Sequence, residues 1–552
     1  MSETENDVSG LAPPGANTRL PKVIGSDVEL GNIIVGRSDG GLGTGYHASR
    51  ALLRAVDGIA SGWQNAWYET WSHWAGGSAS QDWGRKYLAS NGGCAYVDLD
   101  HFEICTPEVR DARDYVAAWG AMLIITQQAK ADADRALPEG QSIFVTVNNS
   151  DRNGSSWGGH LSLLITRELF DSLCVTQSDF PQSYLMAYQC SSILFTGAGK
   201  VGSENGRPNV EFQISQRADF FDSLVGPQTT HRRPLINTRD EPLCGRSHFG
   251  ADDAPADTMA RLHVIFYDST LAPVSTYLKA GVLQIILTMC EAGHLRPNVL
   301  LADPLIALNA WSHDPELNSR ARLRDGTCLT AVEHQMLFLE EARAFVNAGG
   351  CENCVPGADK ILALWEDTLR KLGDRDWDAL LPRLDWVAKR AVLTRAVEQG
   401  DVQWDSAAAR HLDVLFSSLD PDDGVHWSLR RAGLVEAVVT EEETRYFLTN
   451  APVDSRAWTR TMLLRRAGGH AICSINWDEV RVRITADNRA PVFRTVRLDN
   501  PLAHTRADTE RLFAADLDLL TLVDSLGTSD AQVPPAGGMI LSRIHAGWPT
   551  IN

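Results

Sequence analysis

Apolar and polar positions alternate in the first half of the chain and follow helical spacing in much of the second half. The segment 21–36 alternates and predicts a strand or hairpin, and 141–166 predicts two strands around a loop rich in Gly, Asn and Ser. From about 274 to 440 the pattern is helical, with a loop at 348–357. Further strand signals lie at 191–195, 209–215 and 261–267. Strands first and helices later indicate an α+β fold, with an antiparallel sheet backed by helices.

Helical spacing also occurs near the N-terminus, at 46–74 and near 107–136, with a Gly/Ser-rich loop at 75–86 between them. The first of these helices carries an aromatic stripe, formed by Trp63, Trp67, Trp71 and Trp74. We expect this stripe to pack in the core or against a partner helix rather than to bind a cofactor.

The two ends of the chain differ from its centre. Residues 1–22 are acidic and then rich in Pro and Gly, which predicts a disordered tail. After 440 come a Pro-containing link, a helix, the strand-like "EVRVRI" and a last helix near 504–526.

Composition excludes several classes of protein. The net charge of -19 argues against binding a nucleic-acid backbone, which needs an excess of Lys and Arg. The sequence has no apolar run of about 18 residues, so no membrane span is expected. The N-terminus lacks the apolar region of a secretory signal. Ten scattered cysteines, with one Cys-x-x-Cys at Cys351 and Cys354, fit reduced thiols in the cytoplasm better than a zinc site, since no second pair lies nearby.

The stretch "NGGCAYVDLDHFEICTPE" (91–108) places Asp98, Asp100, His101 and Glu103 within six positions, where a buried strand should be apolar. In an extended strand, Tyr96, Asp98 and Asp100 point to one side while His101 and Glu103 point to the other. A bulge or turn after Asp100 would bring both sets to one site, and bulges are frequent beside active sites.

Acidic and basic side chains elsewhere offer further chemistry. Asp27 and Glu29 are two apart on a predicted strand, so they share one face and either hold a hard cation or form a solvated surface. Arg217 and Arg239 suit a phosphate or carboxylate, or else a surface ion pair. The Gly-rich "TGAGKVG" (196–202) lacks the spacing of a P-loop, and a turn near phosphates and a plain turn fit it equally.

Together these segments resemble the Pup ligase and depupylase (deamidase of Pup) family. The blocks that carry the resemblance, in chain order, are "IGSDVELG", "NGGCAYVDLDHFEICTPE", "NNSDRNGSSWGGH", "TGAGKVG", "FQISQRADFF", "RPLINTRDEP", "RLHVIFYDSTLAPVSTYLKAG", "LDWVAKR" and "APVDSRAW". The resemblance implies a glutamine-synthetase-like fold over 23–438, in which a curved antiparallel sheet forms a cradle for ATP and Mg²⁺. It also implies a small C-terminal domain over 439–552, and a small protein or peptide tag, Pup or similar, as the partner.

The resemblance assigns roles to individual residues. It implies that Asp98 is catalytic, as a base or as a nucleophile. Implied metal ligands are Asp27, Glu29, Tyr96 and Glu103. Residues implied to face the nucleotide are His160, Arg217, Arg239 and Trp386.

Three departures from the family pattern are visible. The family's His-Glu-Asn reads His160-Leu161-Ser162, Leu243 replaces a His, and Pro273 replaces a Glu. They suggest a divergent branch, whose tag or peptide differs from standard Pup.

The spacing Asp98-x-x-His101-x-Glu103 and the long segment before it resemble the depupylase more than the ligase. This resemblance implies a hydrolase of an amide or isopeptide at the tag's C-terminal Glu or Gln. The alternatives are an ATP-consuming ligase, which joins a tag glutamate to a lysine through an acyl phosphate, and a nucleotide-binding pseudoenzyme.

Overall fold

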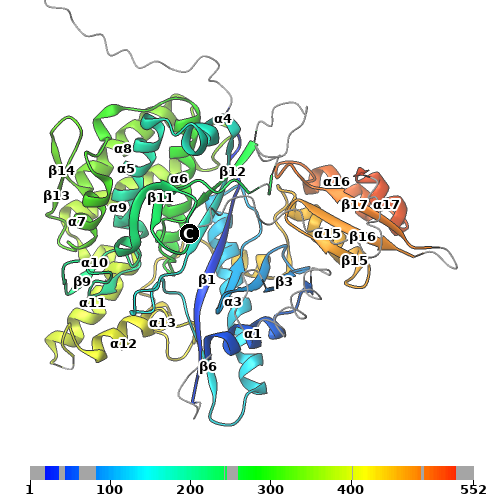
Figure 1. The fold of residues 1–552 in the computed structure, drawn as a ribbon, viewed down its shortest axis with the longest axis horizontal. Coiled ribbons are helices and arrows are strands. Elements are labelled where there is room, and N and C mark those ends of the chain that lie inside the picture. Colours follow the sequence, from blue (N-terminus) through cyan, green and yellow to red (C-terminus); the bar gives the residue numbers. More distant parts are fainter. Residues whose placement is uncertain are drawn as a thin grey trace, which may run out of the picture.

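The computed structural model describes residues 19–36, 44–60, 83–241, 243–244, 259–400, 402–485 and 490–529. One long strand, β1 (Ile24–Val35), pairs with three other strands. This strand lies inside an eight-stranded antiparallel sheet with the order β12-β7-β1-β5-β4-β3-β2, and β6 also pairs with β1 (Figure 1). The strands are β1 (Ile24–Val35), β2 (Ile59–Ala60), β3 (Trp83–Tyr87), β4 (Cys94–Asp98), β5 (His101–Cys105), β6 (Ser142–Thr146), β7 (Gly159–Thr166) and β12 (Met259–Val264).

The strand β1 alternates between buried and more exposed positions along its whole length, as its sequence predicts. It pairs with β5 and β7 through its first half and with β6 through its second half. In this register Asp27 lies opposite His160 of β7, and Glu29 lies opposite Glu103 of β5. Directly opposite residues share one face of a sheet, so strand pairing alone gathers these four side chains.

A bundle of apolar helices covers the sheet and lies mostly to one side of β1 in Figure 1. In it α6 packs against α3, α5 and α9. The larger helices are α1 (Thr44–Ala55), α3 (Ala112–Ala136), α5 (Asp179–Thr196), α6 (Pro273–Glu291), α7 (Pro304–Ser312), α8 (Ala331–Asn347), α9 (Ala358–Asp374), α11 (Asp385–Glu398), α12 (Ala407–Phe416) and α14 (Glu441–Thr449). Short elements are α4 (Arg167–Phe170), α10 (Trp377–Leu380), α13 (Val425–Arg431), β8 (Lys200–Val201), β9 (Phe212–Gln213), β10 (Phe221–Gly226), β11 (Arg233–Asn237), β13 (Arg320–Arg322) and β14 (Cys328–Thr330).

Within the described residues, α6 is the one helix whose length and composition would allow it to cross a membrane. Of its most apolar window, 94% is buried inside the protein, where it packs between other helices.

The C-terminal elements form a second, four-stranded sheet with three helices, seen in orange and red in Figure 1. They are α15 (Ala457–Ala467), β15 (Ile472–Ile475), β16 (Glu479–Ile484), β17 (Val492–Arg497), α16 (Arg506–Ala514), α17 (Leu519–Ser525) and β18 (Thr528–Ser529). Their apolar core is continuous with Tyr87, Cys94, Tyr96 and Cys105 of the large sheet. The predicted boundary near 438 stays a prediction.

Several sequence predictions are confirmed. A strand occupies the 21–36 segment, two strands occupy 141–166, and helices occupy most of 274–440. The strand predicted at 191–195 is wrong, because these residues belong to α5. A short apolar run cannot by itself distinguish a strand from a helix that is buried on all sides.

Other element boundaries in the structure differ from the predicted ones. The first helix ends at Ala55, and Trp63, Trp67, Trp71 and Trp74 lie outside the described residues. Where one last helix is predicted near 504–526, the structure has two helices, α16 and α17. Of the expected tail, residues 1–18 also lie outside the described part of the chain. Residue Lys22, assigned to that tail, is instead fully buried, and its Nζ lies 2.5 Å from Glu291 Oε2.

Candidate active site

The acidic stretch of the sequence folds as the hairpin β4–β5, with Leu99 and Asp100 in its turn. Leu99 takes a left-handed conformation with φ of 52°. The register pairs Asp98 with His101 and Tyr96 with Glu103, so the reversal of the chain brings both sets of side chains to one face. A turn is therefore present, as predicted, but it contains Asp100 instead of following it.

The first group of metal-capable side chains consists of Glu29, Asp98 and Glu103. Their ligand oxygens lie within 4.8 Å of one another. Tyr96 donates a hydrogen bond from its hydroxyl to Glu103. Burial raises the pKa of Glu103 well above its usual range, and the charges of Asp27, Glu29 and Asp98 add to the effect. Three carboxylate ligands suit a hard divalent cation such as Mg²⁺. The charge of the cation would offset the repulsion between these carboxylates.

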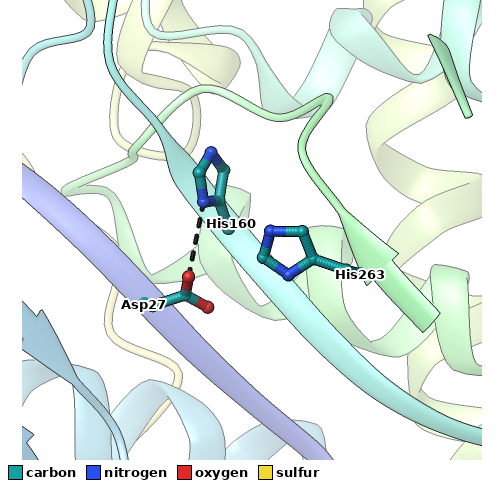
Figure 2. A group of neighbouring side chains, drawn as sticks. All are labelled: Asp27, His160 and His263. Atoms are coloured by element: carbon teal, nitrogen blue, oxygen red, sulfur yellow. Dashed lines mark hydrogen bonds and ion pairs between the residues drawn. The ribbon is translucent and has the colours of Figure 1, made fainter. Parts of the chain in front are cut away.

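The second group joins Asp27 of β1, His160 of β7 and His263 of β12, as Figure 2 shows. His160 Nδ1 lies 3.4 Å from Asp27 Oδ2, and the two imidazole rings meet edge to face at 4.9 Å. Burial lowers the pKa of His263 well below its usual value, which favours the neutral imidazole that binds metals. One carboxylate and two imidazoles form a set that suits a divalent metal ion.

The residue His263 was not identified from the sequence as a site residue, although it lies within the block "RLHVIFYD". Its signal is weak, because a single histidine on a buried strand resembles a core histidine. The register of β12 against β7 places it beside Ser162 and close to His160. For His160, predicted to face the nucleotide, the structure shows Asp27 and His263 as neighbours.

Both groups line one cavity of about 620 Å³. This volume is in the range of small-molecule sites. Its basic residues are Arg85, Arg233, Arg239, Arg261 and Arg456. The C-terminal elements complete its wall with Trp477 and Pro501. The predicted Arg239 lies at the more exposed part, where it pairs with Glu241 at 2.5 Å.

Two predicted residues lie outside the wall of this cavity. Arg217 is fully buried directly behind it, and its Nη1 donates to the Trp157 carbonyl at 2.6 Å. Burial, with the charge of Arg233 next, lowers the pKa of Arg217 to about 9. Trp386 is also fully buried, and its indole N–H donates to the Leu194 carbonyl at 2.8 Å. The structure thus brings Arg217 near the other site residues but does not bring Trp386 to them.

The Gly-rich turn 196–202 lies beside Trp386 and does not line the cavity. A Cβ at Gly199, where φ is 72°, would come within 3.0 Å of the Trp386 Cα, so this position requires glycine. Lys200 of the turn pairs with Glu204 at 2.8 Å and Asp219 at 3.1 Å. The geometry favours the plain structural turn over a turn near phosphates.

The three departures from the family pattern have different consequences. Leu161 points into the apolar core on the opposite face of β7 from His160. A Glu at this position would therefore point away from the cavity, so its replacement by Leu takes no carboxylate from the cavity. Ser162 accepts a hydrogen bond from Arg261 Nη1 at 3.0 Å. Leu243 lines the cavity, whereas Pro273 begins α6, a favourable position for proline.

The open antiparallel sheet backed by helices is a glutamine-synthetase-like fold, and it carries two metal-capable groups beside buried arginines. The chain belongs to the Pup-ligase protein family, whose pattern matches residues 42–481.

Curated relatives fall into two groups. The chain is 35% identical over 395 residues to a depupylase of Acidothermus cellulolyticus, covering 71% of this chain and 74% of the relative. It is 32% identical to the Pup deamidase/depupylase of Mycolicibacterium smegmatis, covering 74% and 78%. It is also 31% identical to the Pup–protein ligase of Micrococcus luteus, covering 78% and 90%.

Solved structures agree with the fold. A complex between Pup and its ligase matches with a TM-score of 0.71 and 22% identity, covering 92% of this chain and 91% of the other. A Pup ligase bound to ADP matches with a TM-score of 0.65 and 24% identity, covering 78% and 89%. The predicted family and fold class are confirmed.

Proposed function

We propose that this protein is a depupylase-like amide hydrolase, which acts on the C-terminal Glu or Gln side chain of Pup or a similar tag. The observation that carries the proposal is the position of Asp98, at the end of a hairpin inside the cavity and next to Glu29 and Glu103. Relatives at 35% and 32% identity are a depupylase and a Pup deamidase/depupylase, which supports this direction.

The residues present fit ATP and a divalent cation as cofactors. Glu29, Tyr96 and Glu103 would hold the cation, and Asp27 would hold a second one together with His160 and His263. Arg217 and Arg239 would face the phosphates. Bound cation and nucleotide supply positive charge and a phosphate group beside the reacting carbonyl.

The chain itself supplies Asp98 for the chemical step. As a general base, the Asp98 carboxylate takes a proton from water, the water oxygen bonds to the carbonyl carbon, and the C–N bond breaks as the nitrogen gains a proton. As a nucleophile, Asp98 itself bonds to the carbonyl carbon, the C–N bond breaks as the nitrogen gains a proton, and water then hydrolyses the resulting mixed anhydride. Label found in Asp98 after a single turnover in heavy-oxygen water would establish the nucleophile, because a general base does not exchange its own oxygens.

The second candidate is a ligase that joins the tag's glutamate to a lysine amine. The match to the Micrococcus luteus ligase favours it, since that match covers 90% of the relative. In this direction Asp98 would take the proton from the attacking amine. The same cavity serves both reactions, because each one passes through attack on the same carbonyl.

Intact-mass analysis of a tag ending in Gly-Gly-Gln, incubated with the protein, ATP and Mg²⁺, tests the proposal. Conversion of the amide to the acid, or release of tag from a conjugate, is expected, whereas a tag–lysine adduct would establish the ligase. Absence of any product from a folded protein that binds nucleotide would establish a pseudoenzyme. An Asp98→Asn variant should lose turnover, while Asp100→Asn, in the exposed turn two residues away, is the matched control.

A further inference from the structure

We propose that Leu99 is a specificity-determining residue, which contacts the aliphatic stem of the lysine in a tag conjugate. The inference rests on and deepens the proposed function, because it names the part of the substrate that adjoins the reacting amide. Leu99 was not identified from the sequence as a site residue, since its signal there is only that of an apolar residue between two acids.

The backbone conformation of Leu99 is unfavourable for leucine. The residue is the first of the two in the turn between β4 and β5, and its φ of 52° is left-handed. Hairpin turns that need a positive φ usually have Gly, Asn or Asp, because most other side chains crowd the backbone in this conformation. Leucine therefore occupies this position against the preference of the turn and at a cost to stability.

Packing in the core does not explain this leucine. Among the described residues, the apolar side chains with a positive φ are those of Leu99 and Leu317. Leu317 is only 8% exposed and packs in the largest apolar cluster, which offsets its backbone cost. Leu99 is 41% exposed. A backbone outlier without a packing role, next to the proposed catalytic residue, points to a function.

Leu99 lies at the mouth of the cavity. It lines the cavity together with Asp98, yet its side chain also faces solvent. Exposure rises along the hairpin, from the buried Tyr96 through the half-buried Asp98 to Leu99. Of the large apolar residues that line the cavity in the described part of the chain, Leu99 is the exposed one. It therefore presents an apolar surface where the cavity opens, beside Asp98.

A tag conjugate supplies a matching apolar group. In an isopeptide, the nitrogen of the reacting amide carries the methylene chain of a lysine, which leads to the backbone of the modified protein. A folded protein does not fit in a cavity of about 620 Å³, so this backbone stays outside. The methylene chain must then run from the amide through the mouth and past Leu99. Lysine stems commonly lie along apolar surface in this way, whereas a free tag ending in Gln has no such stem.

Two conjugates of one carrier peptide test the inference. In the first, the C-terminal Glu side chain of Pup is joined to a lysine of the peptide. In the second, the lysine is replaced by 2,3-diaminopropionate, whose side chain is a shortened lysine with a single methylene. The full chain acts on both with ATP and Mg²⁺, and intact mass gives the ratio of kcat/KM for the lysine conjugate to kcat/KM for the shortened one.

We expect Leu99→Asn to lower this ratio roughly 10-fold, since methylenes in apolar contact discriminate between substrates by this order. Leu99→Met keeps an apolar contact and should preserve the ratio. Asn tolerates the left-handed conformation, so Leu99→Asn should unfold at the same or a higher urea concentration than the wild type. The matched control is Leu434→Asn, because this leucine is 46% exposed and is not part of the cavity wall.

Three results would each overturn the inference: an unchanged ratio in Leu99→Asn, a ratio that falls as far in Leu99→Met, or unfolding of Leu99→Asn at a lower urea concentration than the wild type. A wild type that hydrolyses neither conjugate would refute the proposed function and the inference with it. Hydrolysis of both conjugates, with the same ratio in wild type and Leu99→Asn, would refute the inference alone.

Discussion

The buried carboxylate of Glu108 connects the large sheet to the C-terminal elements, and its removal offers a quantitative test. Glu108 accepts hydrogen bonds from Arg456 Nε at 2.9 Å, from Arg460 Nη1 at 2.9 Å and from Arg460 Nη2 at 2.5 Å. Glu108→Gln keeps the shape of the side chain but removes its charge. Both arginines would then lie buried without their ion-pair partner.

The magnitude follows from the pKa of Glu108. Burial alone would raise this pKa, but the charges of Arg460 and Arg456 outweigh burial and lower it from 4.5 to about 2. At 1.36 kcal/mol per pKa unit, ionised Glu108 contributes about 3 kcal/mol to the free energy of unfolding. Loss of one partner from a buried ion pair typically costs about 3–5 kcal/mol, which is the same range.

The sign of the pH dependence is fixed by the lowered pKa. The contribution of Glu108 is fully present above its unfolded pKa near 4.5 and is lost as the pH falls toward about 2. Urea denaturation of wild type and Glu108→Gln should therefore differ by about 3 kcal/mol near neutral pH, and by progressively less as the solution becomes more acidic than about pH 4.

The matched control is Glu510→Gln, whose carboxylate pairs with Arg506 at 2.8 Å on the surface of α16. An exposed pair of this kind contributes under about 1 kcal/mol, so this variant should resemble wild type. A Glu108→Gln protein as stable as the control at neutral pH, or a difference that does not change with pH, would refute the reasoning.

Two further predictions concern the metal-capable groups, and a third concerns the core residue Leu161. Tyr96→Phe removes the donor to Glu103 and should weaken divalent-cation binding about 10- to 100-fold in calorimetry, with folding preserved; unchanged affinity would exclude Tyr96 from the site. His263→Ala should remove one of two cation-binding events while the other remains, and loss of neither would show that the second group holds no metal. Leu161→Glu places a charge in the core and should lower stability by several kcal/mol rather than restore activity; a stable, more active variant would place this side chain in the cavity.

Local patterns along the chain determine much of the fold. Alternation along 21–36 predicts a strand that presents Asp27 and Glu29 on one face, and β1 has this pattern. The acidic stretch 91–108 predicts a change of direction, and the hairpin β4–β5 provides it. Long helical periodicity predicts α3 close to its observed bounds and predicts the start of α6, although not its end. These features depend on residues that are close together in the chain, so the sequence alone predicts them.

The order and register of the strands determine which side chains from distant segments of the chain meet in the site. His160 and His263 join Asp27 because β7 lies next to β1 and β12 lies next to β7 in the sheet, although both histidines are more than a hundred positions away from Asp27 in the chain. Likewise, the carbonyls of Ser156 and Trp157 accept hydrogen bonds from Arg233 and Arg217, which come from segments around β10 and β11. Local periodicity states which face of a strand a side chain occupies but not which strand lies beside it. That choice depends on backbone hydrogen bonds between distant segments and on the helices that cover the sheet, so only the tertiary structure decides it.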